Sequence, residues 1–275
     1  MITNNELRHL QECELIIARE IKRICEKHDL KYYIVCGTLL GSIRHEGFIP
    51  WDDDIDIGME RKEYDQFCKI CKDELDDAFV LQTWDVDEDF PFSYGKMRLK
   101  GTYIEESFSS GKNSKYNGIF VDIFPFDNVP ENKIKKQKQS AGYYFLKRIL
   151  WLKKGYGASI KNEGKIKCFK YLLSSAILKA LPYQLVKKKY NKFIRKYNDE
   201  CTQELVMDSK YSYEKNIIKR KWLEDTNMYK FEGTEFMSFR DYDAYLSHLY
   251  MNYMKLPPSN QRHNHDIIKI DFGKY

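Results

Sequence analysis

Hydrophobic side chains recur every three or four residues near the start of the chain. Such spacing places them on one side of a helix, which leaves the other side polar. The residues that form this apolar side, within an expected helix over residues 7–27, are Leu7, Leu10, Ile17, Ile21 and Ile24. The pattern therefore predicts a long amphipathic helix that packs against a core.

Shorter apolar or alternating segments predict strands over residues 31–36, 54–58, 79–82, 92–99, 102–105 and 118–124. We expect the strands over 92–99 and 102–105 to pair around Lys100-Gly101, and the last strand to stop at Pro125. Helical patterns cover 61–75 and the Lys-rich stretch from Glu131 to Asn198. Helices and strands thus mix in the first 130 residues, and helices are expected to dominate afterwards.

Acidic residues gather in Asp52-Asp53-Asp54-Ile55-Asp56. On a strand, Asp54 and Asp56 point to one side, while Ile55 points to the other side and into the core. Two adjacent carboxylates repel each other, and a divalent cation removes that cost. Oxygen ligands of this kind suit Mg²⁺ together with substrate phosphates. A solvated acidic loop is the alternative interpretation.

Gly37-Thr38 follows a predicted strand and opens a helix, where free N–H groups bind phosphate. Arg44 would supply a cation one or two turns later. A phosphate cradle followed closely by paired carboxylates indicates a site for a nucleotide and a metal.

Asp122 lies inside the apolar strand 118–124, where an acid is costly unless it is paired or bound to a cation. It is therefore the candidate third metal ligand, with pairing to Lys or Arg as the alternative. Lys96 and Arg98 share one face of their strand. They would contact a phosphate or, alternatively, pair with the acids.

Taken together, these segments resemble the LicD/fukutin family of the nucleotidyltransferase-fold superfamily. The resemblance lies in the run from Gly37-Thr38-Leu39-Leu40-Gly41 to Trp51-Asp52-Asp53-Asp54-Ile55-Asp56, and it continues at Lys96-Met97-Arg98, Val121-Asp122-Ile123 and the C-terminal region. It implies an α/β (α+β) fold with a nucleotidyltransferase-like mixed-sheet core and additional helices. It also implies an Mg²⁺-dependent phosphotransferase, with Mn²⁺ as the alternative metal.

The resemblance further implies transfer of a substituted phosphate, with phosphocholine from CDP-choline as the first choice. The acceptor would be a cell-surface glycan such as teichoic acid, lipopolysaccharide or a capsule precursor. Asp54, Asp56 and Asp122 would be the catalytic and metal-binding triad, with Asp122 as general base. The expected substrate-binding residues are Gly37, Thr38, Leu39, Gly41, Arg44, Trp51, Asp53, Lys96, Arg98, Arg262 and His265. For Arg262 and His265, ordinary charges near the chain end remain the alternative.

Net charge is distributed unevenly along the chain, although the total is only +5. Residues 131–196 hold 19 Lys and Arg and two acids, so this segment carries +17 and the rest −12. We expect a catalytic core over 1–130, a basic helical insert over 131–200 and a segment over 201–275 that completes the core.

Apolar stripes edged by lysine in the basic insert favour contact with an anionic membrane surface. The residues expected to form the stripes are Phe145, Ile149, Leu152, Phe169, Leu172, Leu173 and Ile177. A solvated helical pair facing an anionic glycan is the alternative. With no secretory signal visible and seven cysteines without framework spacing, the protein is expected on the inner face of the cytoplasmic membrane, acting on a lipid-linked glycan. No nucleic-acid partner is expected from so mild a net charge.

Three other functions stay open. The donor could carry ethanolamine or a polyol instead of choline. The enzyme could keep the nucleoside phosphate and release diphosphate, which is true nucleotidyl transfer. The chain could also be a non-catalytic, membrane-associated glycan-binding protein, although a full set of acids argues against this.

Overall fold

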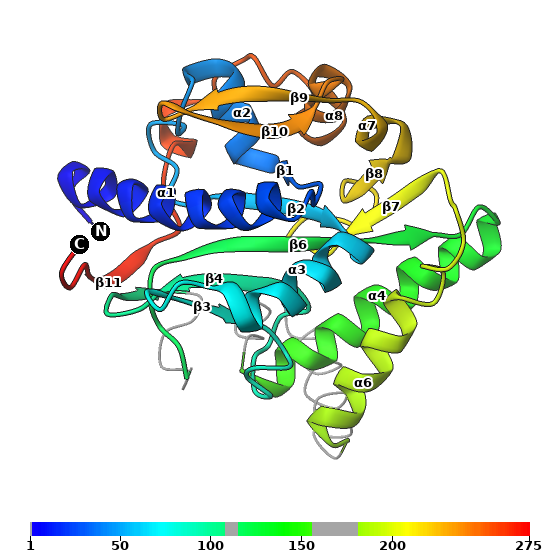
Figure 1. The fold of residues 1–275 in the computed structure, drawn as a ribbon. Helices are drawn as coiled ribbons and strands as arrows, with labels where there is room; N and C mark the ends of the chain where they lie inside the picture. Colours follow the sequence, from blue (N-terminus) through cyan, green and yellow to red (C-terminus); the bar gives the residue numbers. More distant parts are fainter. Residues whose placement is uncertain (1, 108–114, 156–180) are drawn as a thin grey trace.

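A curled, seven-stranded mixed sheet forms the centre of the molecule (Figure 1). The computed structural model describes residues 2–107, 115–155 and 181–275. None of the helices in these ranges combines the length and the apolar character that a transmembrane span requires. The strands, in the order in which they pair, are β1 (Tyr33–Ile34), β2 (Asp56–Glu60), β6 (Phe120–Val129), β4 (Gly95–Leu99) and β3 (Phe79–Gln82), with β7 (Glu204–Met207) and β8 (Ile217–Lys219) added beside β6. The predicted mixed α/β fold is confirmed.

Strand β6 is the longest strand and runs parallel to β2. The expectation that it stops at Pro125 is wrong. Asp122 donates its N–H to Ile55 on the β2 side, so odd-numbered residues of β6 turn their nitrogens toward the opposite edge. That edge pairs with β4 up to Ile123 and with β7 from Phe126. Pro125, which has no N–H, thus lies where the partner strand changes, and the strand continues.

Helix α1 (Asn4–Lys27) matches the predicted amphipathic helix and begins three residues earlier. Thr3 and Glu6 form a capping box that satisfies free N–H groups of the first turn. The apolar side of α1 is buried in the main core, and the helix contacts β6, β4 and α3 (Arg61–Glu74). Both helices lie on one face of the sheet (Figure 1).

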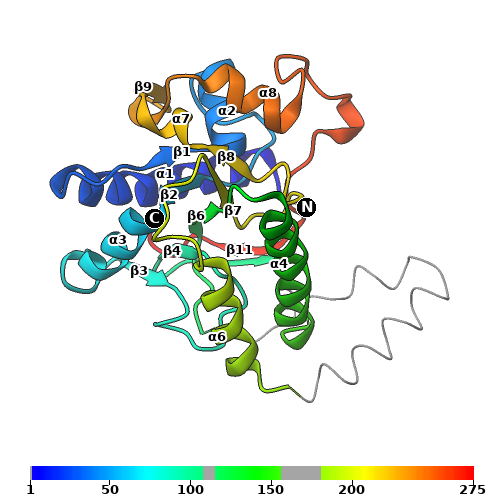
Figure 2. The ribbon, with the colours of Figure 1, turned by 90° about the vertical axis from the view of Figure 1, so that its right-hand side faces the viewer.

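Helix α2 (Cys36–His45) lies in an upper layer with the hairpin of β9 (Thr226–Phe231) and β10 (Thr234–Phe239) and with α8 (Tyr242–Tyr250), seen in Figures 1 and 2. The short helix α7 (Arg220–Glu224) joins β8 to this layer. The predicted strand over 31–36 is shorter than expected, because Cys36 already belongs to α2. The hairpin also corrects the expectation that helices dominate after residue 130.

Strand β5 (Tyr103–Glu106) does not pair with β4, contrary to expectation. It pairs instead with β11 (Ile267–Asp271), the last strand of the chain. Because β11 follows the short turn η2 (Ser259–Gln261), this pairing brings the residues around His265 to the sheet. The two ends of the chain also meet, since the His9 ring stacks on Phe272 at 3.9 Å.

Helices α4 (Lys133–Lys153) and α6 (Tyr183–Ile194) pack against each other below the sheet (Figure 2). Asp208, after β7, joins them by accepting hydrogen bonds from Tyr143 at 2.7 Å and Tyr190 at 2.6 Å, and it pairs with Lys147 at 2.5 Å. The division at residues 130 and 200 stays a prediction, but β7, from beyond residue 200, pairs directly with β6.

The apolar stripe predicted on α4 is divided in the structure. Ile149 is buried in the core between the helices and the sheet, whereas Phe145 is 59% exposed. Stripe members Phe169, Leu172, Leu173 and Ile177 lie outside the described residues. The exposed face of α4 therefore differs from the expected one.

A buried ion pair anchors α3 to the sheet. The Nε and Nη2 atoms of Arg61 donate to the two oxygens of Asp127 on β6 at 2.8 and 2.7 Å. Asn198 donates to the same carboxylate at 2.6 Å, so the pair also holds the chain after α6.

Asp127→Ala should lower the free energy of unfolding by about 3–5 kcal/mol, because Arg61 would remain buried without its partner. The matched control is Asp225→Ala, whose pair with Arg240 is 63% and 65% exposed and is expected to contribute about 0–1 kcal/mol. Urea unfolding of both variants measures the difference. Equal losses would show that the Arg61 pair is not an anchor.

Candidate active site

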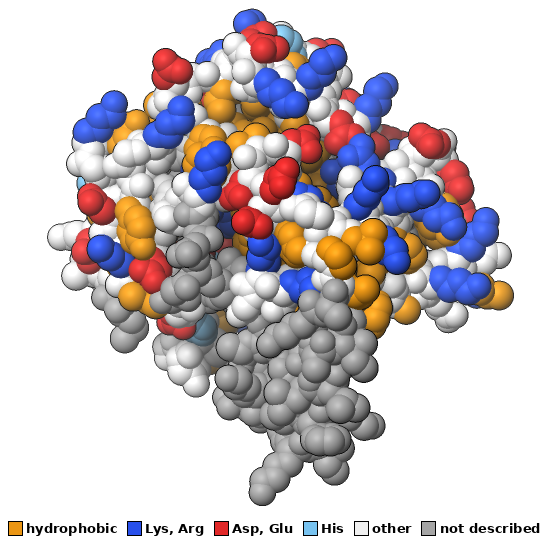
Figure 3. All heavy atoms as spheres, turned by 90° about the horizontal axis from the view of Figure 1, so that it is seen from below, with side chains coloured by type: hydrophobic (Ala, Val, Ile, Leu, Met, Phe, Trp, Pro, Cys, Tyr) orange, Lys and Arg blue, Asp and Glu red, His pale blue; other side chains and the backbone are white. Residues whose placement is uncertain are grey.

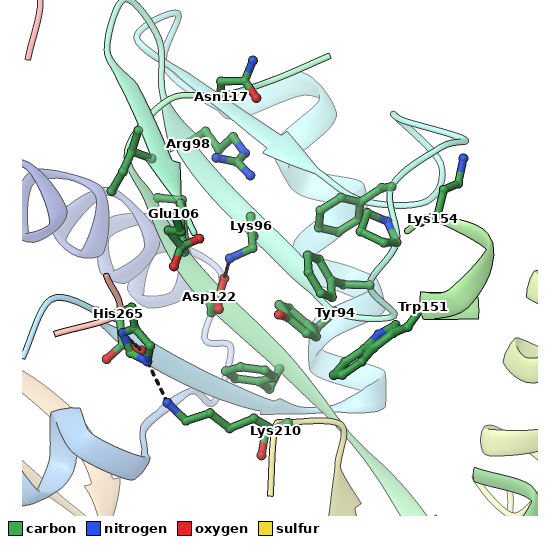
Figure 4. Close-up of a pocket in the computed structure, with 18 of the residues that line it drawn as sticks. Tyr94, Lys96, Arg98, Glu106, Asn117, Asp122, Trp151, Lys154, Lys210 and His265 are labelled. Atoms are coloured by element: carbon green, nitrogen blue, oxygen red, sulfur yellow. Dashed lines mark hydrogen bonds and ion pairs between the residues drawn. The ribbon is translucent and has the colours of Figure 1, made fainter. Parts of the chain in front are cut away.

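A cavity of about 1220 Å³ opens beside the sheet, next to the end of α4 (Figure 4). Acidic, basic and aromatic side chains line different parts of it. The charged residues among them include Asp53, Asp54, Asp56, Lys96, Arg98, Glu106, Asp122, Lys154, Lys210 and His265. Of the fourteen site residues predicted from the sequence, seven thus line one cavity.

Asp56 and Asp122 face each other at the same register position of the parallel strands β2 and β6. Side chains at paired positions of adjacent strands point to the same face of a sheet. The Thr38 hydroxyl supports this arrangement from α2, since it accepts the N–H of Asp56 at 2.8 Å. The sequence predicted both acids, and the parallel pairing explains why they meet.

The carboxylates lie in an environment that opposes their charge. Burial, followed by the neighbouring carboxylates of Asp54 and Asp122, raises the pKa of Asp56 well above its ordinary value. Burial and Asp54 do the same to the pKa of Asp52. Burial also raises the pKa of Asp122, although Lys96 works against it. The acids therefore form a cluster that needs cations.

Two lysines supply part of that positive charge. Lys96 on β4 pairs with Asp122 on the neighbouring strand β6 at 2.7 Å, and Figure 4 shows this contact as a dashed line. Burial opposes the charge of Lys210, but the carboxylates of Asp54 and Asp56 outweigh it and raise the pKa of Lys210. Sequence reasoning missed Lys210, because nothing near it in the chain resembles a motif.

The oxygen-only donor set fits a hard divalent cation by its chemistry. As they stand, however, no three His, Cys, Asp or Glu side chains within 2–107, 115–155 and 181–275 converge into a metal site. Asp122 already contacts Lys96, whereas the Asp56 carboxylate receives no hydrogen bond or ion pair from the described residues. Asp54 and Asp56 are thus the better-fitting pair, and Asp122 would have to exchange Lys96 for the metal.

His265 reaches the acidic cluster from the C-terminal segment. Its Nδ1 lies 2.7 Å from Asp53 Oδ1, and its backbone N–H donates to the same carboxylate. The hydrogen bond with Asp53 raises the pKa of His265 to about 9, against the opposing effects of burial and of Lys210. Lys210 Nζ lies 2.8 Å from the other ring nitrogen (Figure 4). The β5–β11 pairing makes this contact, and the sequence alone does not show it.

Arg98 lines the far end of the cavity from β4. Its guanidinium donates to Gln82 and to the carbonyl of Gly118, both at 2.6 Å. Lys96 thus pairs with an acid, whereas Arg98 donates to an amide and a backbone carbonyl, and the contact of both residues with a phosphate stays a prediction.

Seven predicted residues do not line this cavity. Leu39 is fully buried in the core, and a side chain at Gly41 would meet the carbonyl of Gly47 at 2.4 Å. Gly37 packs in the same way against Asp52. The helix start expected to cradle phosphate thus packs against the acidic loop, and Cys36 is its contribution to the cavity lining.

Arg44, Trp51 and Arg262 lie outside the lining of this cavity. Arg44 donates to the carbonyl of Tyr253 at 3.0 Å, and the Arg262 guanidinium lies 5.2 Å from the Trp51 ring centroid. These predicted contacts to substrate stay predictions, since the described cavity does not include them.

Comparisons with known proteins identify the family of this chain. Residues 29–154 match the family model described as LicD/FKTN/FKRP, nucleotidyltransferase domain. The lipopolysaccharide cholinephosphotransferase LicD of Haemophilus influenzae is 30% identical over 267 residues, which cover 95% of this chain and 96% of that protein. The human and mouse ribitol 5-phosphate transferase FKRP is 29% identical over 117 residues, 42% of this chain and 20% of those proteins. The chain therefore belongs to the LicD family, as the sequence motifs predicted.

Asp56→Asn should raise the melting temperature in EDTA by about 2–4 °C, because it removes one of the mutually repelling charges. Millimolar Mg²⁺ should then raise the melting temperature of the wild type but not of the variant. Asp73→Asn, an exposed change on α3, is the matched control and should behave as wild type. Differential scanning calorimetry measures the melting temperatures. If Asp56→Asn melted below this control in EDTA, the proposed repulsion among the carboxylates would be contradicted.

Proposed function

We propose that this protein is a metal-dependent transferase that moves phosphocholine from CDP-choline onto a hydroxyl of a cell-surface glycan and releases CMP. The glycan would be a teichoic acid, lipopolysaccharide or capsule precursor. The observation that carries this proposal is the cavity in which Asp56 and Asp122 meet. Its support is a cholinephosphotransferase that matches the chain almost from end to end.

In this reaction the acceptor oxygen bonds to the phosphorus that carries choline, and the bond from that phosphorus to CMP breaks. Asp122 takes the proton of the acceptor hydroxyl. Burial makes this carboxylate more basic, while Lys96 at 2.7 Å restrains its protonation in the resting enzyme. Such transfer depends mainly on positioning and on neutralising charge.

Cations of the cavity would neutralise the donor's diphosphate. Lys210 lies beside the acids, so it would contact the phosphates where they approach Asp54 and Asp56. Asp54 and Asp56, and Asp122 once it releases Lys96, would hold Mg²⁺ or Mn²⁺. The bound metal would offset charge on the leaving CMP and make the acceptor hydroxyl more acidic.

A second donor has support from one observation. The FKRP relatives are named for ribitol 5-phosphate, so a polyol phosphate is the rival transferred group. Ethanolamine phosphate, true nucleotidyl transfer and non-catalytic glycan binding have no such observation here.

Incubating the protein with CDP-choline, Mg²⁺ and a hydroxyl acceptor should release CMP and no diphosphate. Asp54→Asn should lower the rate roughly 100-fold or more, because an amide does not replace a metal-binding carboxylate. Asp73→Asn should stay within about twofold of wild type, as exposed substitutions commonly do. Chromatography of the nucleotide products measures both.

Release of diphosphate would identify nucleotidyl transfer instead. Turnover of a CDP-polyol with none of CDP-choline would assign the second donor. Activity of Asp54→Asn within tenfold of wild type in saturating Mg²⁺ would contradict the role given to the carboxylates.

We also propose that α4 and α6 rest on an anionic membrane. Exposed residues of α4 at helical spacing form one mixed face: Ile134, Lys138, Ala141, Phe145 and Arg148. On α6, Leu185, Lys188 and Lys189 are exposed as well. On part of the face seen from below, Figure 3 shows hydrophobic and basic side chains intermixed, with acidic ones among them. Such a mixture suits the headgroup region of an acidic bilayer, and the cytoplasmic leaflet is the proposed location.

The protein should co-sediment with vesicles that contain acidic lipids and much less with neutral ones, since each basic residue near the surface contributes about 1 kcal/mol. Lys188→Glu combined with Lys189→Glu should weaken this binding and leave turnover of a soluble donor unchanged. The matched charge change is Lys62→Glu with Lys69→Glu, both exposed on α3, and it should have less effect. If the wild type did not co-sediment with acidic vesicles at low salt, the proposed membrane contact would be wrong.

A further inference from the structure

Four aromatic rings form one wall of the cavity, which we call the aromatic wall: Phe92, Tyr94, Phe124 and Trp151. Phe92 and Tyr94 stack at 5.0 Å, and Tyr94 contacts Phe124 at 4.5 Å. Trp151, from the last turn of α4, meets Phe92 edge-on at 6.3 Å. The wall therefore joins the sheet to the basic helix, and Figure 4 shows Tyr94 and Trp151 on the side of the cavity toward α4.

The side-chain ammonium of Lys96 lies at the boundary between this wall and the acids. This ammonium lies 3.3 Å from the centroid of Phe120, which also lines the cavity, and 5.6 Å and 5.8 Å from those of Phe92 and Tyr94, within the range of cation–π attraction. The same ammonium lies 2.7 Å from Asp122. The carboxylate of Asp122 and the rings are thus close enough for one ammonium group to contact both. A donor whose phosphate lies near the acids would therefore place the group attached to that phosphate against the wall.

The ring of Trp151 is held in place from its own helix. Lys147 lies one turn earlier, with its ammonium 4.8 Å from the Trp151 centroid. Asp208 at 2.5 Å and the carbonyl of Ser209 at 2.7 Å bind that ammonium in turn. Since Ser209 and Lys210 also line the cavity, one network positions the ring and the loop that carries Lys210.

The chemistry of the wall favours one kind of headgroup. Its surface is π-electron rich, and its polar atoms are the Tyr94 hydroxyl and the Trp151 N–H. A polyol brings several hydroxyl groups, for which the rings themselves offer only these two polar atoms. A quaternary ammonium has no N–H and is attracted to the faces of aromatic rings.

Resting on the phosphocholine transfer proposed above, we propose that the aromatic wall binds the trimethylammonium group of the donor and selects it over neutral and polyol donors. Phe92, Tyr94 and Trp151 would surround the methyl groups, with Phe124 behind Tyr94. The wall is then the specificity determinant, and the acids opposite it act on the phosphate.

The first test changes the ligand and leaves the protein intact. CDP-choline is compared with its neutral isostere CDP-3,3-dimethylbutanol, and with CDP-ethanolamine and CDP-glycerol. The wild type should bind CDP-choline roughly 5- to 30-fold more tightly than the neutral isostere by calorimetry, which is the range of a desolvated cation–π contact. CMP release should follow the same order.

The second test changes the wall. Tyr94→Leu and Trp151→Leu should remove most of the preference for CDP-choline over the neutral isostere, with little change toward CDP-glycerol. Tyr94→Phe and Trp151→Phe keep a ring at the same position, so they are the matched controls and should retain the preference. A Leu variant that fails to fold, as judged by its melting curve, is replaced by the ligand comparison on the wild type.

The outcomes separate this inference from the proposed function. Turnover of several CDP donors with no preference for the charged over the neutral isostere overturns the aromatic wall and leaves the transferase function standing. Equal losses for CDP-choline and CDP-glycerol in the Leu variants do the same. A wild type that turns over no CDP donor overturns both.

Discussion

Repulsion among buried carboxylates is the constraint on which the rest of the site depends. Strands β2 and β6 run in parallel and set Asp56 beside Asp122, while Asp52 and Asp54 lie immediately before β2. Each charge makes the others harder to ionise, and burial strengthens the effect. An arrangement of this kind is stable only if positively charged groups lie close to it. Several of the surrounding elements contribute such a group.

The groups that contact these acids come from three distant parts of the chain. Lys96 reaches Asp122 from β4, Lys210 comes from the loop after β7, and His265 contacts Asp53 from the segment before β11. Each depends on a strand pairing, with β4 and β7 on one edge of β6 and β11 on β5. The same edge of β6 accommodates Pro125 where its partner changes from β4 to β7. The strand pairings of the sheet therefore determine which charged groups surround the acids.

The basic helices connect to this site through Asp208. Its hydrogen bonds to Tyr143 and Tyr190, and its ion pair with Lys147, tie α4 and α6 to the loop that also carries Lys210. Packing of α4 against that loop in turn presents Trp151 to the cavity. The helices that would face a membrane thus contact the residues of the proposed headgroup pocket. This arrangement would place a lipid-linked acceptor next to the donor.

Local pattern was enough to predict α1, α3, the alternation of Asp54, Ile55 and Asp56, and the acid in the middle of β6. These features rest on side-chain periodicity and on the cost of burying a charge, and both are properties of neighbouring residues. The motifs around residues 37–56 and 122 were also enough to indicate the family. Local pattern gave no access to Lys210, to the Asp53–His265 contact or to the aromatic wall, and it wrongly paired β5 with β4. These were decided by tertiary structure, because each depends on which strands become neighbours across gaps of many residues, a choice made by the packing of the whole core.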